Sequence, residues 1–346
     1  MRFRTFGKIG TFLAAGLAVA GLLAGCNNSS TASGGPKIGL DLPRSDTDFW
    51  VAYSKYVPQE AKDLGVDLMP TTNSQNDITK LAANVQAMVS QGAKAIVIAP
   101  QDTGAVVGTL NTLAGKNIPV VSVDTRPDSG KVYMVVRADN VAYGTKSCQF
   151  LGQQLHGTGK VVDLEGALDS INGRDRTNAF DACMKQNYPG ITVYGVPTGW
   201  DSTKGANGLQ TVLTQHPDIN GIYSQAGGVF LAPTLQVLKS AGKLIPAGKP
   251  GHITIVSNDG IPAEFAAIRQ GYLDATVSQP ADLYAKYALY YAQAAVAGKT
   301  FKPGPTDHNS TIVSWGNGNL EDELPAPLVT AANVNDKSLW GNQLTS

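Results

Sequence analysis

The segment 95–123, AIVIAPQDTGAVVGTLNTLAGKNIPVVSV, decides the fold of this chain. It begins with an unbroken apolar run at 95–99 and ends with a largely apolar run at 119–123, in which Ser122 is the polar residue. Between these runs, residues 106–116 have the apolar spacing of a helix. Continuous apolar strands that alternate with helices are typical of a parallel sheet covered on both faces. The segment therefore predicts an α/β fold.

The same alternation extends to both sides of this segment. We predict further strands at 37–42, 66–70, 160–164, 192–196, 221–224, 253–257, 275–277 and 311–314. We predict further helices at 50–64, 78–91, 141–155, 174–186, 204–215, 231–240, 263–270 and 283–297. This is too much secondary structure for one doubly wound sheet, so we expect two α/β lobes.

Charge and composition exclude several classes of protein. Lys and Arg number 27, Asp and Glu also number 27, and charged residues are only 16% of the chain. This balance excludes the basic footprint of a nucleic-acid binder and the high net charge of a disordered polyelectrolyte. Three cysteines in 346 residues are too few for a disulfide scaffold.

The first 25 residues have the pattern of a signal peptide. A positively charged start, with Arg2, Arg4 and Lys8, precedes an apolar run at 9–23 that is short for a membrane span. The run ends in Leu23-Ala24-Gly25-Cys26, which resembles a bacterial lipobox; the resemblance implies cleavage before Cys26 and a lipid on its thiol. The alternative is a plain signal peptide with an accidental cysteine. Residues 26–36 are polar and rich in Ser and Gly, as in a tether.

Cys148 and Cys183 remain in the body of the chain, each in a predicted helix. An oxidising compartment permits a disulfide between them. The alternative is that both are small buried apolar side chains.

Polar and aromatic residues follow the predicted strands. Ligands of open parallel sheets bind beyond the carboxyl ends of the strands. The residues found there are Thr47, Phe49, Trp50, Asp102, Asp124, Thr125, Asn172, Arg176, Trp200, Gln225, Asp259 and Gln279. Carboxylates, amides and a guanidinium bind hydroxyl groups, and aromatic faces pack on the C–H faces of a sugar. Taken singly, Asp102 is more typical of a helix N-cap, and the aromatic residues are more typical of a core.

The order and spacing of several motifs resemble a known family. These are Asp48-Phe49-Trp50, LAANVQ at 81–86, PVVSVD at 119–124, Ala138-Asp139-Asn140 with Gly144, Arg176 with Phe180, Ser257-Asn258-Asp259 and ATVSQ at 275–279. The chain looks like a type I periplasmic sugar-binding protein of the ribose-binding branch, over about residues 37–314. The resemblance implies two Rossmann-like parallel-sheet lobes joined by a three-stranded hinge. One lobe would hold 37–138 with 280–308, the other 139–279 with 309–346, with crossings near Ala138, Gln279 and Asn309.

The resemblance also implies roles for the site residues. Phe49 and Trp50 would stack on one face of the sugar, and Trp200 would close the other face from the second lobe. The groups that bind hydroxyls and the ring oxygen would be Asp124 and Arg176, with Asp259 and Gln279 near the hinge.

This chain departs from the ribose pattern at three places. Thr47 stands where ribose binders often have Asn, and Thr125 stands where they have Arg. The segment 225–230 replaces a family segment that supplies a ligand amide, with Gln225 as the nearest substitute. These changes favour a different pentose, a hexose, a deoxysugar or a polyol over ribose.

The resemblance implies a lipid-anchored extracytoplasmic binding protein that captures a small sugar or polyol by hinge closure and delivers it to an ABC importer. We expect a monomer with no cofactor, metal or nucleic acid and no catalytic residues. The main alternative is a sugar-sensing co-receptor for chemotaxis or signalling, which would use the same closed state. A quorum-signal binder would need a lysine early in the first binding loop, where Arg44 is the nearest residue.

A glycan-active enzyme is a further alternative, because sequence alone does not exclude paired carboxylates. The four histidines have no metal-ligand spacing and none lies beside a candidate nucleophile. Gly298-Lys299-Thr300 lacks the upstream glycine of a phosphate loop and follows a predicted helix.

Overall fold

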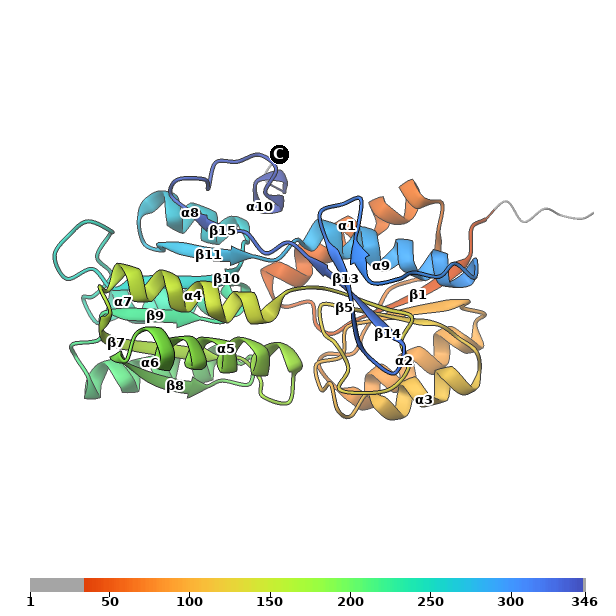
Figure 1. Ribbon diagram of the computed structural model, residues 1–346, viewed down its shortest axis with the longest axis horizontal. Helices are drawn as coiled ribbons and strands as arrows, with labels where there is room; N and C mark the ends of the chain where they lie inside the picture. The colour runs from red at the N-terminus through yellow and green to blue at the C-terminus, as the bar shows by residue number, and fades with distance from the viewer. Residues whose placement is uncertain (1–33, 345–346) are drawn as a thin grey trace, which may run out of the picture. The chain divides into compact units, whose positions relative to one another are not determined.

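The computed structural model describes residues 34–344. Two separate sheets organise this part of the chain, and each has helices on its faces (Figure 1). The two-lobed α/β fold expected from the sequence is therefore confirmed. Cys26 and the signal peptide lie outside the described residues.

The first sheet has nine strands in the order β12-β13-β14-β6-β5-β4-β1-β2, with β3 also paired to β1. Its central strands are β1 (Lys37–Leu42), β4 (Ala95–Ile98), β5 (Val120–Val123), β6 (Met134–Ala138) and β14 (Asn319–Leu324). The remaining strands are the two-residue β2 (Asp67–Leu68), β3 (Thr72–Asn73) and β12 (Gly304–Pro305), and β13 (Thr311–Gly316), which lies between β12 and β14. The central strands run parallel, as their continuous apolar sequences predict.

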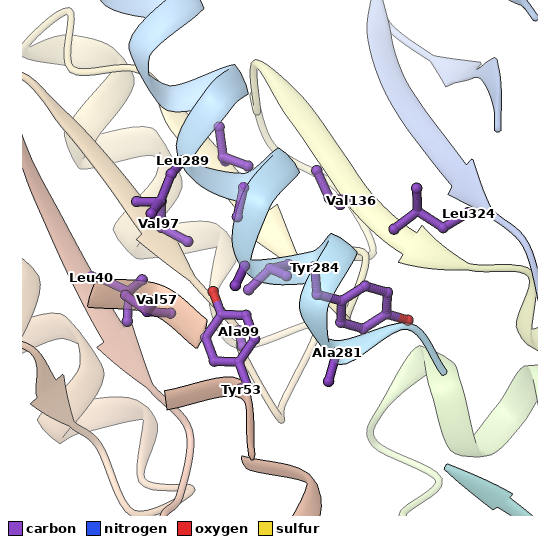
Figure 2. Close-up of a cluster of buried hydrophobic side chains, with 14 of the residues drawn as sticks. Leu40, Tyr53, Val57, Val97, Ala99, Val136, Ala281, Tyr284, Leu289 and Leu324 are labelled. Carbon is purple, nitrogen blue, oxygen red and sulfur yellow. The ribbon is translucent and has the colours of Figure 1, made fainter. Parts of the chain in front are cut away.

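Four helices cover the first sheet: α1 (Asp48–Leu64), α2 (Ile78–Ser90), α3 (Val107–Gly115) and α9 (Ala281–Val296). Helices α1 and α9 share one buried cluster, in which Tyr53 and Tyr284 are fully buried. Figure 2 shows this cluster, with Leu289 of α9 lying over Val97 of the sheet. A second cluster joins α2 and α3 to the opposite face. This sheet with its helices is the first lobe.

The second lobe has a six-stranded sheet in the order β15-β11-β10-β9-β7-β8. Its strands are β7 (Thr158–Glu165), β8 (Gly190–Pro197), β9 (Gly221–Ser224), β10 (Thr254–Asp259), β11 (Ala275–Ser278) and the antiparallel β15 (Leu328–Thr330). Its helices are α4 (Asn140–Gln154), α5 (Ile171–Asn187), α6 (Ser202–Gln215), α7 (Gly227–Ser240), α8 (Pro262–Gln270) and α10 (Trp340–Gln343). A disulfide between Cys148 and Cys183 joins α4 to α5. The sequence left open whether these cysteines form a disulfide or are two small buried apolar side chains. The structure contains the disulfide.

The chain passes between the sheets three times, after β6, after β11 and after β14. The first two passages agree with the expected crossings at Ala138 and Gln279. The third differs from the crossing expected at Asn309, because β13 and β14 form a hairpin and β14 pairs parallel with β6. Residues 311–324 therefore lie in the first lobe. Ile312 and Leu324 are buried in the cluster beneath α1 and α9, which explains this placement.

The turn of this hairpin has a sequence, Gly-Asn-Gly, from which the hairpin could have been predicted. Gly316, Asn317 and Gly318 all have positive φ, a conformation that Gly and Asn adopt readily. Strand β6 was missed for a different reason. Arg137 interrupts its apolar run, although its side chain is only 2% exposed.

Between residues 34 and 344, none of the helices is both long and apolar enough to cross a lipid bilayer.

Candidate functional site

A cavity lies between the two lobes, where loops from the carboxyl ends of both sheets meet. About 450 Å³ of space within it and at its open mouth is not filled by protein atoms. Nine residues predicted from the sequence line it: Thr47, Phe49, Trp50, Asp124, Asn172, Arg176, Trp200, Asp259 and Gln279. The structure thus brings together residues that lie more than two hundred positions apart in the chain.

Three of the lining residues have left-handed backbone conformations. Asp124 has φ 66°, Trp200 has φ 59° and Asp259 has φ 117°. Such values cost free energy for a residue with a side chain, and in proteins they cluster at functional sites. Here Asp259 is the last residue of β10, Asp124 directly follows β5 and Trp200 lies in the turn before α6, so all three stand where the backbone changes direction at the cavity wall.

Two buried carboxyl groups give the cavity an acidic character. Asp259 accepts hydrogen bonds from the backbone N–H of Gly228 at 2.8 Å and from Nε2 of Gln279 at 2.6 Å. Burial raises the pKa of Asp259 to about 6, against the opposing charge of Arg176. Burial likewise raises the pKa of Asp124 to about 6, with Arg176 and Arg137 opposing the shift.

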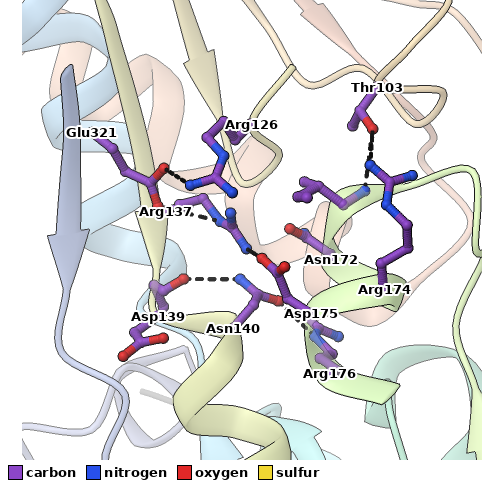
Figure 3. Close-up of polar contacts among 12 residues, drawn as sticks. Thr103, Arg126, Arg137, Asp139, Asn140, Asn172, Arg174, Asp175, Arg176 and Glu321 are labelled. Carbon is purple, nitrogen blue, oxygen red and sulfur yellow. Dashed lines mark hydrogen bonds and ion pairs between the residues drawn. The ribbon is translucent and has the colours of Figure 1, made fainter. Parts of the chain in front are cut away.

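Arg176 is the central cation of the site, and its guanidinium is held on several sides. Nε donates to Oδ1 of Asn140 at 2.7 Å, and Nη1 donates to the carbonyl of Gln225 (Figure 3 shows the Asn140 contact). The guanidinium carbon lies 5.0 Å from the centre of the Tyr143 ring and 5.5 Å from the Trp200 ring. The group is thus oriented before any ligand arrives.

Several polar atoms of the cavity wall are buried without a hydrogen-bond partner among the described residues. They are Oγ of Ser170, Oδ1 of Asn172 and Nε1 of Trp200. Buried polar atoms in folded proteins are nearly always satisfied. On residues that line the cavity, these atoms leave a hydroxyl, an amide oxygen and an indole N–H available for hydrogen bonds.

The aromatic side chains form opposite walls. Phe49 and Trp50 come from the first turn of α1 and meet edge to face, with ring centres 5.3 Å apart. The side-chain oxygen of Thr47 caps this helix, accepting from the backbone N–H of Trp50. On the second lobe, Trp200 packs against Gly166, where even a Cβ would collide with the indole.

Polar contacts close the two lobes around the cavity. Arg44 donates to the carbonyl of Trp200 at 3.1 Å. The fully buried Arg137 of the first lobe pairs with Asp175 of the second at 2.8 Å (Figure 3).

A further group of contacts joins the lobes at the outer edge of the cavity. Arg174 of the second lobe binds Asp128 and Thr103 of the first. The Thr103 hydroxyl also accepts from the backbone N–H of Ile171. These contacts and the pairs formed by Arg44 and Arg137 tie the two lobes together in the described structure.

Comparison with known families matches residues 38–300 to the family described as periplasmic binding protein domain. The chain belongs to this family. The match covers most of the chain, and it agrees with the resemblance found in the sequence.

Curated relatives of this periplasmic binding protein are similar along most of their length. A ribose import binding protein of Bacillus subtilis (strain 168) is 29% identical over 262 residues, which are 76% of this chain and 82% of the relative. A xylitol-binding protein of Mycolicibacterium smegmatis is 27% identical over 301 residues, 86% of this chain and 83% of the relative.

Solved structures share the fold. An ABC transporter solute-binding protein of Mycobacterium smegmatis with bound glycerol has a TM-score of 0.75 and 25% identity, and the match covers 87% of this chain and 96% of that one. One from Bacillus halodurans C-125 with bound myo-inositol has a TM-score of 0.76 and 20% identity, covering 90% and 99%.

Three predicted ligand residues do not line the cavity of this periplasmic binding protein. Oδ1 of Asp102 accepts from the backbone N–H groups of Gly104 and Ala105, so Asp102 caps the turn before α3. Thr125 is buried behind the wall that Asp124 forms.

Gln225 is the most informative of these corrections. Its side chain points into the second lobe, where Nε2 donates to Asp163 and Thr177 and Oε1 accepts from the backbone N–H of Gly166. All of its amide capacity is thus used internally. It does not replace the ligand amide that the ribose pattern has in this segment.

The cavity also has lining residues that the prediction missed: Arg44, Gln101, Ser170, Ala226 and Val229. Each lies within four residues of a predicted position. Within residues 34–344, no group of three or more His, Cys, Asp or Glu side chains is arranged to hold a metal ion.

Proposed function

We propose that this chain is an extracytoplasmic solute-binding lipoprotein. It captures a small sugar or polyol between its two lobes by hinge closure and delivers it to an ABC importer. The observation that carries the proposal is the cavity itself, where charged, amide and aromatic groups from both lobes converge on one small space.

The chemistry of the wall favours a neutral ligand with several hydroxyl groups. Asp124 and Asp259 can accept from hydroxyls, and Arg176 can donate to a hydroxyl or ring oxygen. The unpaired atoms of Ser170 and Asn172 add further polar partners. Phe49, Trp50 and Trp200 supply apolar faces for the C–H groups of the same ligand.

A ligand other than ribose is the better fit. Thr125 is buried behind the wall and the Gln225 amide is bound internally, so neither contributes the contact that its position in the ribose pattern would imply. A different pentose, a hexose, a deoxysugar or a polyol remains the proposed class. The two relatives are named for ribose and xylitol, which are likewise small molecules with several hydroxyl groups.

The test of ligand class is a thermal-shift screen of residues 27–346 against pentoses, hexoses, deoxysugars, alditols, inositols and nucleosides. A ligand that binds only the folded state raises the melting temperature at saturation. We expect one hit or one narrow group of hits, confirmed by calorimetry. Asp124→Asn should abolish the shift, whereas Asp102→Asn should retain it, because Asp102 caps a turn outside the cavity. The proposal would be contradicted if no compound in the panel raised the melting temperature, or if both variants lost the shift equally.

The lipid anchor has a separate test. When the full chain is expressed in a bacterial host, it should partition into a detergent phase, and mass spectrometry should find diacylglycerol on Cys26. Cys26→Ser should remain in the aqueous phase with unchanged sugar binding. Aqueous partitioning of both forms would reject lipidation and leave the ligand assignment untouched.

A further inference from the structure

The end of the first lobe farthest from the cavity has an excess of lysine. The beginnings of β1, β4, β5 and β6 and the C-terminal ends of α1, α2, α3 and α9 meet at this end. We call it the basic face, defined by Lys37, Lys62, Lys94, Lys116, Lys131, Lys299 and Lys302, all exposed except the partly exposed Lys37. The carboxylates there are Asp63 and Asp67, with the half-buried Glu60 one turn further in. Because the whole chain has balanced charge, this excess is a local feature.

Side-chain contacts show that the basic face is one continuous surface. Nζ of Lys37 reaches the carbonyl of Gln91 at the end of α2. Nζ of Lys116 donates to Oε1 of Gln86, which joins the ends of α3 and α2, at 2.8 Å. The Tyr133 hydroxyl donates to the carbonyl of Lys299 at 2.7 Å, which joins β6 to the loop after α9.

The basic face also has an open hollow. Lys131 and Lys299 line it together with Tyr133 and Phe301. Val296, one of the few large apolar side chains exposed in the described chain, lies close by at the end of α9. Lysines beside aromatic and aliphatic side chains are typical of protein surfaces at the boundary between water and a bilayer.

The chain enters the first lobe at this same face. Pro36 shares a surface hollow with Val296 and Lys299, and Figure 1 shows the red start of the described chain beside the end of α9. A fully extended chain from Cys26 to Pro36 spans at most about 35 Å. If Cys26 carries a lipid, as proposed above, the basic face stays within that distance of the membrane.

We propose that the basic face docks on an anionic phospholipid surface. The lysines would neutralise headgroup phosphates, while the aromatic side chains and Val296 reach the boundary of the acyl chains. The lipid on Cys26 holds the chain at the bilayer, and the basic face orients it with the cavity end of the first-lobe sheet away from the headgroups. This inference rests on the proposed lipidation for its location, but the surface itself can be measured without the lipid.

The test is co-sedimentation of residues 34–346, without lipid, with vesicles of phosphatidylcholine containing about a third phosphatidylglycerol. Both sheets and all four buried clusters lie within residues 37–344, so this piece contains the whole folded core. We expect binding to the mixed vesicles at low salt. Release at high salt, and at least tenfold weaker binding to pure phosphatidylcholine, would show that the attraction is electrostatic.

Two triple variants with the same net charge identify the surface. Lys94, Lys131 and Lys299 are replaced by Glu in the first variant, and Lys185, Lys239 and Lys249 in the second. All six lysines are exposed, and the second set lies on the second lobe. Lys185 and Lys239 are in the last turns of α5 and α7, where lysine also complements the helix dipole, and Lys249 is in the loop between α7 and β10.

The first variant should bind the anionic vesicles at least tenfold more weakly than the unmodified protein, and the second should bind within about threefold. Both should retain the thermal shift with the cognate ligand, which shows that the fold and the cavity are intact. Equal weakening in both variants would mean that net charge alone causes the binding. That result, or no binding by the unmodified protein, would overturn the proposal.

Discussion

Asp124 combines a strained backbone, full burial and a pKa raised to about 6 in one residue. An unfolded chain releases this proton near pH 3.8, whereas the folded protein holds it until about pH 6. Between these values the native state binds more protons, so its free energy of unfolding falls as the pH rises. The raised pKa therefore makes the ionised carboxylate costly to the ligand-free fold above pH 6.

Asp124→Asn removes this titration while keeping the shape of the side chain. Relative to the variant, the unmodified protein should lose stability from about pH 4 to pH 6, by up to roughly 1.4 kcal/mol per unit. Urea unfolding of both proteins without ligand, across that range, measures the difference. A difference that does not change with pH would mean that burial does not raise this pKa.

Trp200 offers a second residue-scale prediction, because its indole closes the cavity from the second lobe. Trp200→Ala should weaken ligand binding by roughly 1–3 kcal/mol through lost stacking area. Trp315→Ala is a matched control: Trp315 is also half-buried beside an arginine, but it lies on β13 away from the cavity. Calorimetry with the cognate ligand should separate the two, and equal losses would remove Trp200 from the site.

At the scale of elements, the disulfide is the covalent link between α4 and α5. Cys148 and Cys183 lie 35 positions apart, and a closed loop of that length stabilises a fold by about 3–4 kcal/mol through the unfolded state. Replacing both by Ala should lower the free energy of unfolding by that order. The ligand dissociation constant should stay within about twofold, because neither cysteine lines the cavity. Unchanged stability would show that the bridge contributes little to the fold.

The same scale shows what the sequence could reveal about this fold. Strands such as β4 and β5 were predictable because both faces are buried, which leaves an apolar run that is continuous in β4 and interrupted only by Ser122 in β5. Strand β14 was not predicted, since Glu321 and Asp322 make it look like a loop. Glu321 is buried by pairing with Arg126 and Arg137, and Asp322 by contacts with Ser310, Tyr291 and His308. Partners that are distant in sequence leave no local pattern.

The cavity-lining residues, like the strands, could be predicted in part from local sequence patterns. The residues after each strand fall at one sheet edge whatever the details of the loops, which located Asp124, Arg176 and Asp259. Whether a side chain then faces the ligand depends on its neighbours. Gln225 turns away because Asp163 and Thr177 bind its amide, and neither contact could be read from sequence spacing.

For the whole molecule, the proposed hinge closure would also depend on direct contacts between the lobes. Arg174→Ala removes the pairs with Asp128 and Thr103 across the lobes. The groups are partly exposed, so the loss should be about 1 kcal/mol or less, and ligand affinity should fall by up to about fivefold. X-ray scattering should also show a larger radius of gyration for the ligand-free variant.

Arg269→Ala is the matched control for that experiment, because Arg269 is an arginine whose contacts stay within the second lobe. It should change neither the affinity nor the scattering. If both variants lower affinity equally, the effect comes from general destabilisation, and the contacts between lobes do not set the closure equilibrium.

The three passages between the sheets also dictate an order of completion during synthesis and export. The second lobe lies almost entirely in the uninterrupted span from α4 to β11 and needs only β15 and α10 from later residues. The first lobe begins earlier. However, two of its elements come after that span: α9, which covers its sheet, and β14, which pairs with β6. As the polypeptide emerges amino terminus first, the part made first must wait, with apolar strands uncovered, until α9 and β14 have been made. A pause or truncation late in translation would therefore damage the earliest-made lobe most.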